Sequence, residues 1–236
     1  MIKLDIIIPV YNEDENIVRL LKALEDEIVC NFRVLICYDK DSDGTLKYLR
    51  GNNIIDKEIL LIKNPKQGPN SAIIEGINSS IAEIILIYMA DDFESIKLIN
   101  NMINLIERGN ELVMPSRFIT GGKMLGAKKI KKMITIIGSY LICYLARIPF
   151  KDCTNAFKMF SADLKNKIKL SSTTGFTFSL ELTIKTYLLN LKIIEIPSIW
   201  IETKNRKSNF RIYKWLPYYI YWLMFSMIKN LFKKSK

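Results

Sequence analysis

The sequence predicts one α/β domain built on a doubly wound parallel sheet. Short runs of Ile and Leu alternate with longer amphipathic segments over residues 3–89. The short runs are apolar on both faces, as is typical of strands in a parallel sheet that helices cover on both sides. A chain of 236 residues is also long enough to form one large core without dividing.

The elements of the front half follow in a regular order. Apolar runs predict strands at 3–10, 32–38, 58–63 and 83–89. Between them, amphipathic segments predict helices at 13–28, 43–50 and 68–80. In the first of these helices, Ile17, Leu20 and Leu24 recur at helical spacing, and Asn12 is placed to cap its start.

Polar residues follow each predicted strand. The four segments read PVYNE, YDKDSDGT, NPKQGPNSA and ADDFE. Ligands of such sheets bind beyond the carboxyl ends of the strands, so these segments are the candidate site. None of them matches GxGxxG or GxxxxGK[ST], which excludes a dinucleotide-binding fingerprint and a P-loop.

Adjacent carboxylates, Asp91 and Asp92, follow the apolar run 84–89. They have two interpretations: they cap a helix that begins near Ser95, or they hold a divalent cation such as Mg²⁺ or Mn²⁺. The loop after the second strand carries three further acids, Asp39, Asp41 and Asp43. An uncompensated group of acids repels itself, which favours the cation.

The distribution of charge points to a basic rear half. The formal net charge is +11, yet 17 of the 24 acidic residues lie in residues 1–95. Residues 117–132 hold six basic and no acidic residues, and residues 203–236 hold nine and none. Such a face suits nucleic acid, anionic lipid or a phosphorylated substrate. Nucleic acid fits least, because the aromatic residues gather in one apolar segment instead of alternating with basic ones.

The four cysteines form no CxxC pair, and the chain has no histidine, which argues against a zinc site. They are expected to be buried thiols. The apolar run at the N-terminus is too short for a secretory signal and acids follow it at once, so a cytoplasmic location is expected.

Two charge-free stretches, 133–146 and 215–228, are 14 residues each. Both fall short of the roughly 20 residues that a bilayer-spanning helix needs. The second stretch is rich in Trp and Tyr and has lysines at both ends. We therefore expect residues 211–236 to form a helix beyond a domain at 1–210, either packed on that domain or lying in the membrane interface.

Taken in order, several motifs resemble one known family. PVYNE, YDKDSDGT, ADDFE, PSRFITGG, KDCTNAFKMFS, GFTFSLEL and KSNFRIYKWLPYYIYW follow one another over nearly the whole chain. This order resembles family-2 glycosyltransferases of the GT-A fold, in the dolichyl-phosphate mannosyltransferase or polyprenyl-phosphate branch. The resemblance implies a mixed, mainly parallel sheet with helices on both faces. It also implies an inverting transferase that moves a sugar from a nucleoside-diphosphate sugar, with Mg²⁺ or Mn²⁺, to a polyprenyl phosphate or a surface-glycan intermediate at the cytoplasmic membrane face.

The same resemblance implies roles for individual residues. The nucleotide-binding positions are Pro9, Tyr11, Glu13, Asp39 and Asp91. The metal ligands are Asp92 and Glu94, and the acceptor or phosphate contacts are Arg117, Lys132, Thr135, Lys207 and Ser208. Asp152 is the carboxylate that faces the reaction centre. It is the candidate general base if the acceptor is a hydroxyl, whereas an anionic phosphate acceptor needs no base.

The chain departs from the family pattern at three positions. Ala90 stands where the first carboxylate of a DxD-type motif is usual, Thr203 where an Arg is usual and Arg206 where a Gly is usual. The loss at Ala90 leaves a second hypothesis open, in which the chain is a catalytically degenerate module that binds sugar nucleotides or docks on membranes. Transfer or hydrolysis of a sugar nucleotide distinguishes the two.

Overall fold

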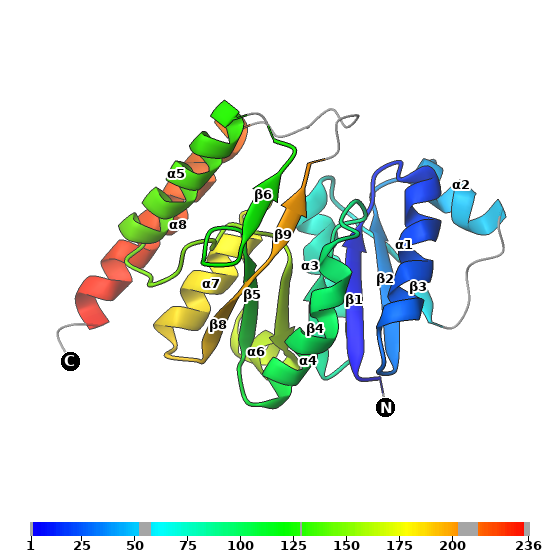
Figure 1. Cartoon of the computed structure of the whole chain (residues 1–236), viewed down its shortest axis with the longest axis horizontal. Helices are drawn as coiled ribbons and strands as arrows, with labels where there is room; N and C mark the ends of the chain where they lie inside the picture. The colour runs from blue at the N-terminus through cyan, green and yellow to red at the C-terminus, as the bar shows by residue number, and fades with distance from the viewer. Residues whose placement is uncertain (1, 52–57, 128, 203–211, 234–236) are drawn as a thin grey trace.

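A computed structural model describes residues 2–51, 58–127, 129–202 and 212–233. It confirms the predicted α/β class, with a seven-stranded sheet in the order β3-β2-β1-β4-β7-β5-β8 and a separate ribbon of β6 and β9 (Figure 1). The elements are β1 (Leu4–Pro9), α1 (Asp14–Glu27), β2 (Phe32–Tyr38), α2 (Gly44–Gly51), β3 (Ile59–Lys63), α3 (Pro69–Ser79), β4 (Ile84–Ile87), the 3₁₀ turn η1 (Ser95–Leu98), α4 (Ile99–Glu107), β5 (Leu112–Ser116), β6 (Lys123–Leu125), α5 (Lys129–Leu145), β7 (Lys158–Ser161), α6 (Ala162–Lys167), α7 (Phe178–Leu188), β8 (Ile193–Pro197), β9 (Ile199–Ile201) and α8 (Ile212–Lys233).

Strand β7 makes the sheet mixed. It pairs antiparallel with both β4 and β5, whereas β1, β2, β3 and β4 pair parallel with one another, as do β5 and β8. Because β7 runs against its neighbours, its first residue lies at the edge where β4 and β5 end. The segment that precedes β7 therefore reaches the same edge as the loops after those two strands.

The sheet is buried between two helical layers. On β1, Ile6 and Ile8 pack in one apolar cluster with residues of α1, α2 and α4, while Ile7 packs in another with residues of α3, α6 and α7. Strand β4 alternates in the same way, with Leu86 on the first side and Ile87 on the second. This double burial explains why the strands are apolar at nearly every position.

The predicted strands and helices of the front half all form, with boundaries that differ from the sequence-based ones by a few residues at most. One local prediction was wrong. The N-cap of α1 is Glu13, and Asn12 does not cap this helix. Its side-chain oxygen instead accepts the Gly44 N–H at the start of α2, 2.9 Å away. A contact between residues so far apart in the chain leaves no local signal.

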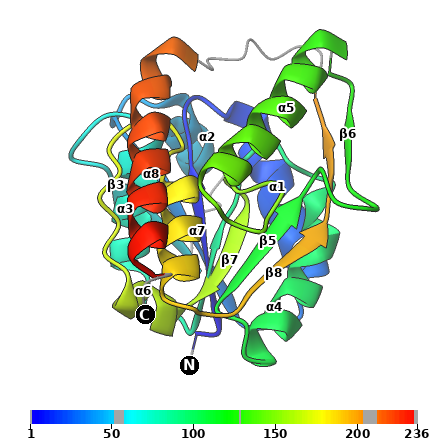
Figure 2. The same ribbon diagram turned by 90° about the vertical axis from the view of Figure 1, so that its left-hand side faces the viewer.

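Helices α5, α7 and α8 form a third packing unit beside the sheet. Figure 2 shows α7 beside α8, whereas α5 meets α8 only near its C-terminal end and diverges from it towards its start. Trp222 of α8 is buried in a cluster that includes Cys143 and Ala146 of the α5 region and Leu180 of α7. The C-terminal helix therefore packs on the rest of the chain.

The outer surfaces of α5 and α8 are apolar. We use the term α5–α8 face for their exposed large apolar side chains. These are Ile130, Met133, Ile134, Ile137, Tyr140, Leu141, Tyr144 and Leu145 on α5, with Leu216, Tyr218, Ile220, Tyr221, Met224, Met227, Ile228 and Leu231 on α8. Within the described ranges, neither helix is both long and apolar enough to cross a bilayer.

A lysine is buried beneath the carboxyl edge of the sheet. Lys158, the first residue of β7, is fully buried, and its Nζ contacts Thr183 Oγ1 at 3.0 Å and Met114 Sδ at 3.2 Å. Among the residues described, no carboxylate lies within ion-pair distance of it. Burial lowers the pKa of Lys158 from 10.5 to about 8, because the charged form is poorly solvated there.

We predict that the free energy of unfolding of the wild type increases with pH, and that Lys158→Met removes this increase. Between about pH 8 and 10.5 the unfolded chain keeps a proton on Lys158 that the native state has lost, so the free energy of unfolding increases over this window, by about 3 kcal/mol in all. Urea denaturation of both proteins at pH 7, 8, 9 and 10 measures it. Thr183 keeps a partner in the variant, because its hydroxyl also donates to the Ser179 carbonyl. Identical pH profiles for the two proteins would contradict the assignment.

Candidate active site

The site is built where β1 and β2 end. Pro9 closes β1, and Tyr11 follows it with 64% of its surface exposed. Glu13 is buried, and its N–H donates to Thr45 Oγ1 at 2.9 Å. The turn after β1 is thereby fixed to the start of α2, with the Tyr11 ring left free to meet a flat ligand.

Asp39 joins the end of β2 to the start of α3. Its carboxylate accepts hydrogen bonds from Asn64 Nδ2 at 2.7 Å and from the Gly68 N–H at 2.8 Å. Gly68 is the N-cap residue of α3 and has φ +104°, a conformation that glycine adopts readily. Asp39 thus links the end of β2 to the loop between β3 and α3.

The acids after β2 do not form a cation site. Asp43 is buried and accepts the N–H groups of Thr45 and Asn12. Asp41 is exposed and pairs with Lys63. The sequence suggested that these acids need a cation or solvent to relieve their repulsion, whereas amide groups and a lysine compensate Asp43 and Asp41 in the structure.

The loop after β4 brings Asp91, Asp92 and Glu94 to the same edge. Asp92 Oδ1 accepts the Ser95 N–H at 3.0 Å, so Asp92 does cap the turn η1, as one of the two interpretations expected. Its backbone carbonyl accepts the Tyr88 hydroxyl at 2.6 Å. Burial raises the pKa of Asp92, so a positive partner would stabilise its ionised form.

These carboxylates fit a divalent cation only as a partial ligand set. No group of three or more acidic, His or Cys side chains in the described chain is arranged to enclose a metal ion. Mg²⁺ commonly takes one or two protein carboxylates and completes its shell with water and substrate phosphates. Only a mode of binding that needs one or two protein carboxylates is therefore compatible with the described residues.

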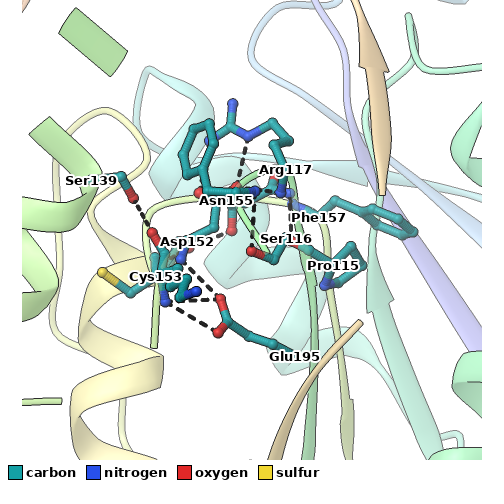
Figure 3. Close-up of polar contacts among 12 residues, drawn as sticks. Pro115, Ser116, Arg117, Ser139, Asp152, Cys153, Asn155, Phe157 and Glu195 are labelled. Atoms are coloured by element: carbon teal, nitrogen blue, oxygen red, sulfur yellow. Dashed lines mark hydrogen bonds and ion pairs between the residues drawn. The ribbon is translucent and has the colours of Figure 1, made fainter. Parts of the chain in front are cut away.

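On the other side of the edge, Arg117 and Asp152 form a buried ion pair (Figure 3). Arg117 Nε and Nη2 donate to the two Asp152 oxygens at 2.7 and 2.8 Å, and the Arg117 N–H donates at 3.0 Å. The Asp152 side chain is fully buried and that of Arg117 is 14% exposed. Asp152 therefore holds Arg117 in one orientation.

Neighbouring residues fix the segment that carries Asp152. Glu195 of β8 accepts the N–H groups of Lys151 and Asp152, and Ser139 of α5 donates to the Lys151 carbonyl at 2.8 Å (Figure 3). The pattern of the sequence gave Glu195 no role of its own. Its function depends on the parallel pairing of β5 with β8, which a local motif does not reveal.

Arg117 also lines a cavity of about 380 Å³ between α5 and the β6–β9 ribbon. We call it the basic cavity. Its cationic lining residues are Arg117, Lys123 and Lys132, and its apolar ones include Phe118, Met124, Ile136 and Tyr140. Lys123 and Tyr140 were not among the predicted site residues. The cavity thus combines positive charge with an apolar wall.

The remaining predicted residues lie apart from this cavity or outside the described structure. Thr135 is on α5, three residues after Lys132, and is not part of the cavity lining. Lys207 and Ser208 fall within 203–211, outside the described residues. The structure therefore brings Arg117 and Lys132 to one cavity, with Asp152 hydrogen-bonded to Arg117.

Loop 171–176 connects α8 to the first turn of α3. Buried Glu181 accepts the N–H groups of Ser171 and Ser172, each at 2.7 Å. Trp222 Nε1 donates to Ser172 Oγ at 2.9 Å, and the Ser172 carbonyl accepts from Asn70 Nδ2 at 2.6 Å. Asn70 lies in the first turn of α3, next to the Gly68 that donates to Asp39.

We predict that Asp152→Asn destabilises the fold by about 3 kcal/mol, because it leaves the Arg117 charge in a desolvated position without its counter-charge. Urea denaturation at pH 7 measures the loss. Asp41→Asn is the matched control, since it removes an exposed partner of Lys63 and should leave stability nearly unchanged. Equal effects of the two substitutions would contradict the structural role of the buried pair.

Comparisons with known proteins concern the family and the fold. The model of the family described as glycosyl transferase family 2 matches residues 5–169. The undecaprenyl-phosphate mannosyltransferase of Micrococcus luteus is 27% identical over 207 residues, which cover 86% of this chain and 85% of that protein. The dolichol-phosphate mannosyltransferase of Pyrococcus furiosus is 24% identical over 202 residues, or 83% of this chain and 55% of that protein.

A solved structure shares the fold. Glucosyl-3-phosphoglycerate synthase from Mycobacterium tuberculosis, in complex with Mn²⁺, uridine diphosphate and phosphoglyceric acid, aligns with a TM-score of 0.71 at 12% identity, over 95% of this chain and 78% of that one. At this identity the likeness concerns the fold alone. The family model, in contrast, covers more than half of the sequence, and this protein belongs to glycosyl transferase family 2.

Proposed function

We propose that this protein is an inverting glycosyltransferase that moves a sugar from a nucleoside-diphosphate sugar to a polyprenyl phosphate at a membrane surface. The basic cavity is the observation that carries the proposal. Arg117, Lys123 and Lys132 match the charge of a phosphate, while the apolar wall leads towards the α5–α8 face and matches an isoprenoid chain. The names of the two mannosyltransferase relatives agree with such an acceptor.

The donor would lie on the opposite side of the same edge. We assign the base and ribose to the floor formed by Pro9, Tyr11, Glu13 and Asp39. Asp92 and Glu94 would hold Mg²⁺ or Mn²⁺ together with the diphosphate, and Asp91 would lie on the nucleotide side. When bound, such an ion would neutralise the charge that develops on the departing nucleoside diphosphate.

A phosphate acceptor explains why Asp152 need not act as a base. The oxygens of the acceptor phosphate are ionised at neutral pH, so one of them can attack the anomeric carbon without losing a proton. Attack on the face opposite the leaving group inverts that centre. Arg117 and Lys132 would orient the acceptor phosphate, and Asp152 would act as a positioning residue for Arg117, because three donors of Arg117 occupy its carboxylate.

The test of the proposal is transfer from UDP- and GDP-sugars to a polyprenyl phosphate, with Mg²⁺ or Mn²⁺ present. Thermal stabilisation by each sugar nucleotide first identifies the donor, because a ligand that binds only the native state raises its stability. A glycosylated lipid product supports the proposal. Stabilisation with neither transfer nor hydrolysis would favour the degenerate binding module that Ala90 suggests, and transfer to a hydroxyl of a glycan alone would replace the lipid acceptor.

We predict that Asp92→Asn lowers sugar transfer by about 100-fold, because it removes a charge that the metal–diphosphate complex requires. Asparagine retains a side-chain oxygen that can cap η1, so the loop should keep its structure. Initial rates over a range of Mn²⁺ concentrations measure the effect. Asp41→Asn, on the neighbouring loop, is the control. Unchanged turnover of the Asp92 variant would rule out the metal assignment.

We predict that the double substitution Met224→Glu and Ile228→Glu lowers binding to anionic vesicles by about tenfold, because it places charge on the α5–α8 face. Both side chains are at least half exposed, so the fold should tolerate the change. Sedimentation with phosphatidylglycerol vesicles measures binding. Ile81→Glu, at an exposed position between α3 and β4, is the control. Equal sedimentation of all three proteins would contradict docking through this face.

A further inference from the structure

Two buried cysteines meet between α5 and the segment that precedes β7. The Sγ atoms of Cys143 and Cys153 are 2.8 Å apart, and the two residues are 2% and 0% exposed. A disulfide bond requires about 2.05 Å between the sulfur atoms. A small movement of either side chain would therefore be enough to bond them.

The surroundings hold both cysteines in place. Ser179 Oγ donates to the Cys153 carbonyl at 3.0 Å, and Ser139, one turn before Cys143 on α5, donates to the Lys151 carbonyl. Apolar side chains, among them Ala146 and Leu180, pack around the two thiols. The contact is thus part of a well-packed unit and does not depend on a loose loop.

We propose that Cys143 and Cys153 are a modification site, at which a hydroperoxide forms a reversible disulfide that fastens α5 to the segment carrying Asp152. A small oxidant suits a site that is almost closed to solvent. Cys30 and Cys37 pack in two other apolar clusters, apart from each other and from this pair. The pairing is therefore specific to these two positions.

The chemistry is a two-electron oxidation of the dithiol. The Cys143 thiolate attacks a peroxide oxygen, the O–O bond breaks, and a sulfenic acid and hydroxide (or alkoxide) form. Cys153 sulfur then attacks Cys143 sulfur, the S–O bond breaks, and the hydroxyl group leaves as water with the proton of Cys153. The peroxide is reduced as the two thiols are oxidised.

The electrostatics favour Cys143 as the first nucleophile. The hydrogen bond between the two sulfur atoms lowers the pKa of Cys143, and the nearby Lys158 ammonium acts in the same direction. Burial raises the pKa of Cys153, which suits a resolving thiol that reacts second. The same buried Lys158 thus lies beside the only close thiol pair of the described chain.

The disulfide would join the two walls of the basic cavity. Lys132 and Tyr140 belong to α5, whereas Arg117 on the opposite wall is held by Asp152, the residue before Cys153. A disulfide there would keep these walls from moving apart, so the oxidised protein should use the acceptor about tenfold less efficiently, with binding of the sugar nucleotide unchanged. This consequence rests on the proposed function, whereas bond formation does not.

The experiment treats the intact protein with hydrogen peroxide, blocks free thiols with an alkylating agent after unfolding, and identifies linked peptides by mass spectrometry. The expected product is a Cys143–Cys153 peptide that dithiothreitol reverses. Cys30→Ala should retain it, and Cys143→Ala and Cys153→Ala should each lose it. Two free thiols at 143 and 153 under conditions that oxidise Cys30 would overturn the proposal, as would linkage only between separate molecules.

Acceptor kinetics then separate this inference from the proposed function. Oxidation should lower kcat/KM for the polyprenyl phosphate in the wild type and leave both alanine variants unaffected. An active protein that forms the linked peptide without a change in acceptor kinetics would refute the effect on the cavity. A reduced protein that forms the peptide on oxidation but never transfers sugar would refute the function and leave the modification site intact.

Discussion

The buried ion pair between Arg117 and Asp152 is the interaction on which the acceptor side of the molecule depends. Two charges are withdrawn from water, and each is tolerable only because the other lies within 3 Å. The pair bridges the residue after β5 and the segment before β7, which meet because β7 runs antiparallel between β4 and β5. Glu195 and Ser139 hold the same segment from β8 and α5.

Much of the fold could be predicted from the sequence because its determinants are local. The apolar runs and helical periodicities of residues 3–89 specify strands and helices that need no distant partner to be recognised. The polar segments after each strand likewise identify the edge at which Asp39, Asp91 and Asp92 gather. The ordered motifs further predicted a mixed sheet, which the strand order confirms, and the family, which the family model confirms.

Partners that are distant in sequence could not be predicted in this way. Asp43 resembled a cation ligand, but it binds amides of its own loop and of Asn12. The sequence made Asp152 a candidate base, but it gave no sign that Arg117 donates to both of its oxygens. Lys158 and the Cys143–Cys153 contact also went unrecognised, since they depend on how β7, α5 and α7 pack. The sequence identified residues better than it identified their partners.

Hydrogen bonds run from Trp222 through Ser172 to Asn70, and so connect α8 to the first turn of α3, next to Asp39. If binding to a membrane surface displaced α8 outward, these hydrogen bonds would have to break, or the first turn of α3 would have to move with α8. A ligand that binds Asp39 and needs the first turn of α3 in its present position would therefore disfavour the displacement of α8. By thermodynamic reciprocity, displacement of α8 would lower the affinity of that ligand by the same factor.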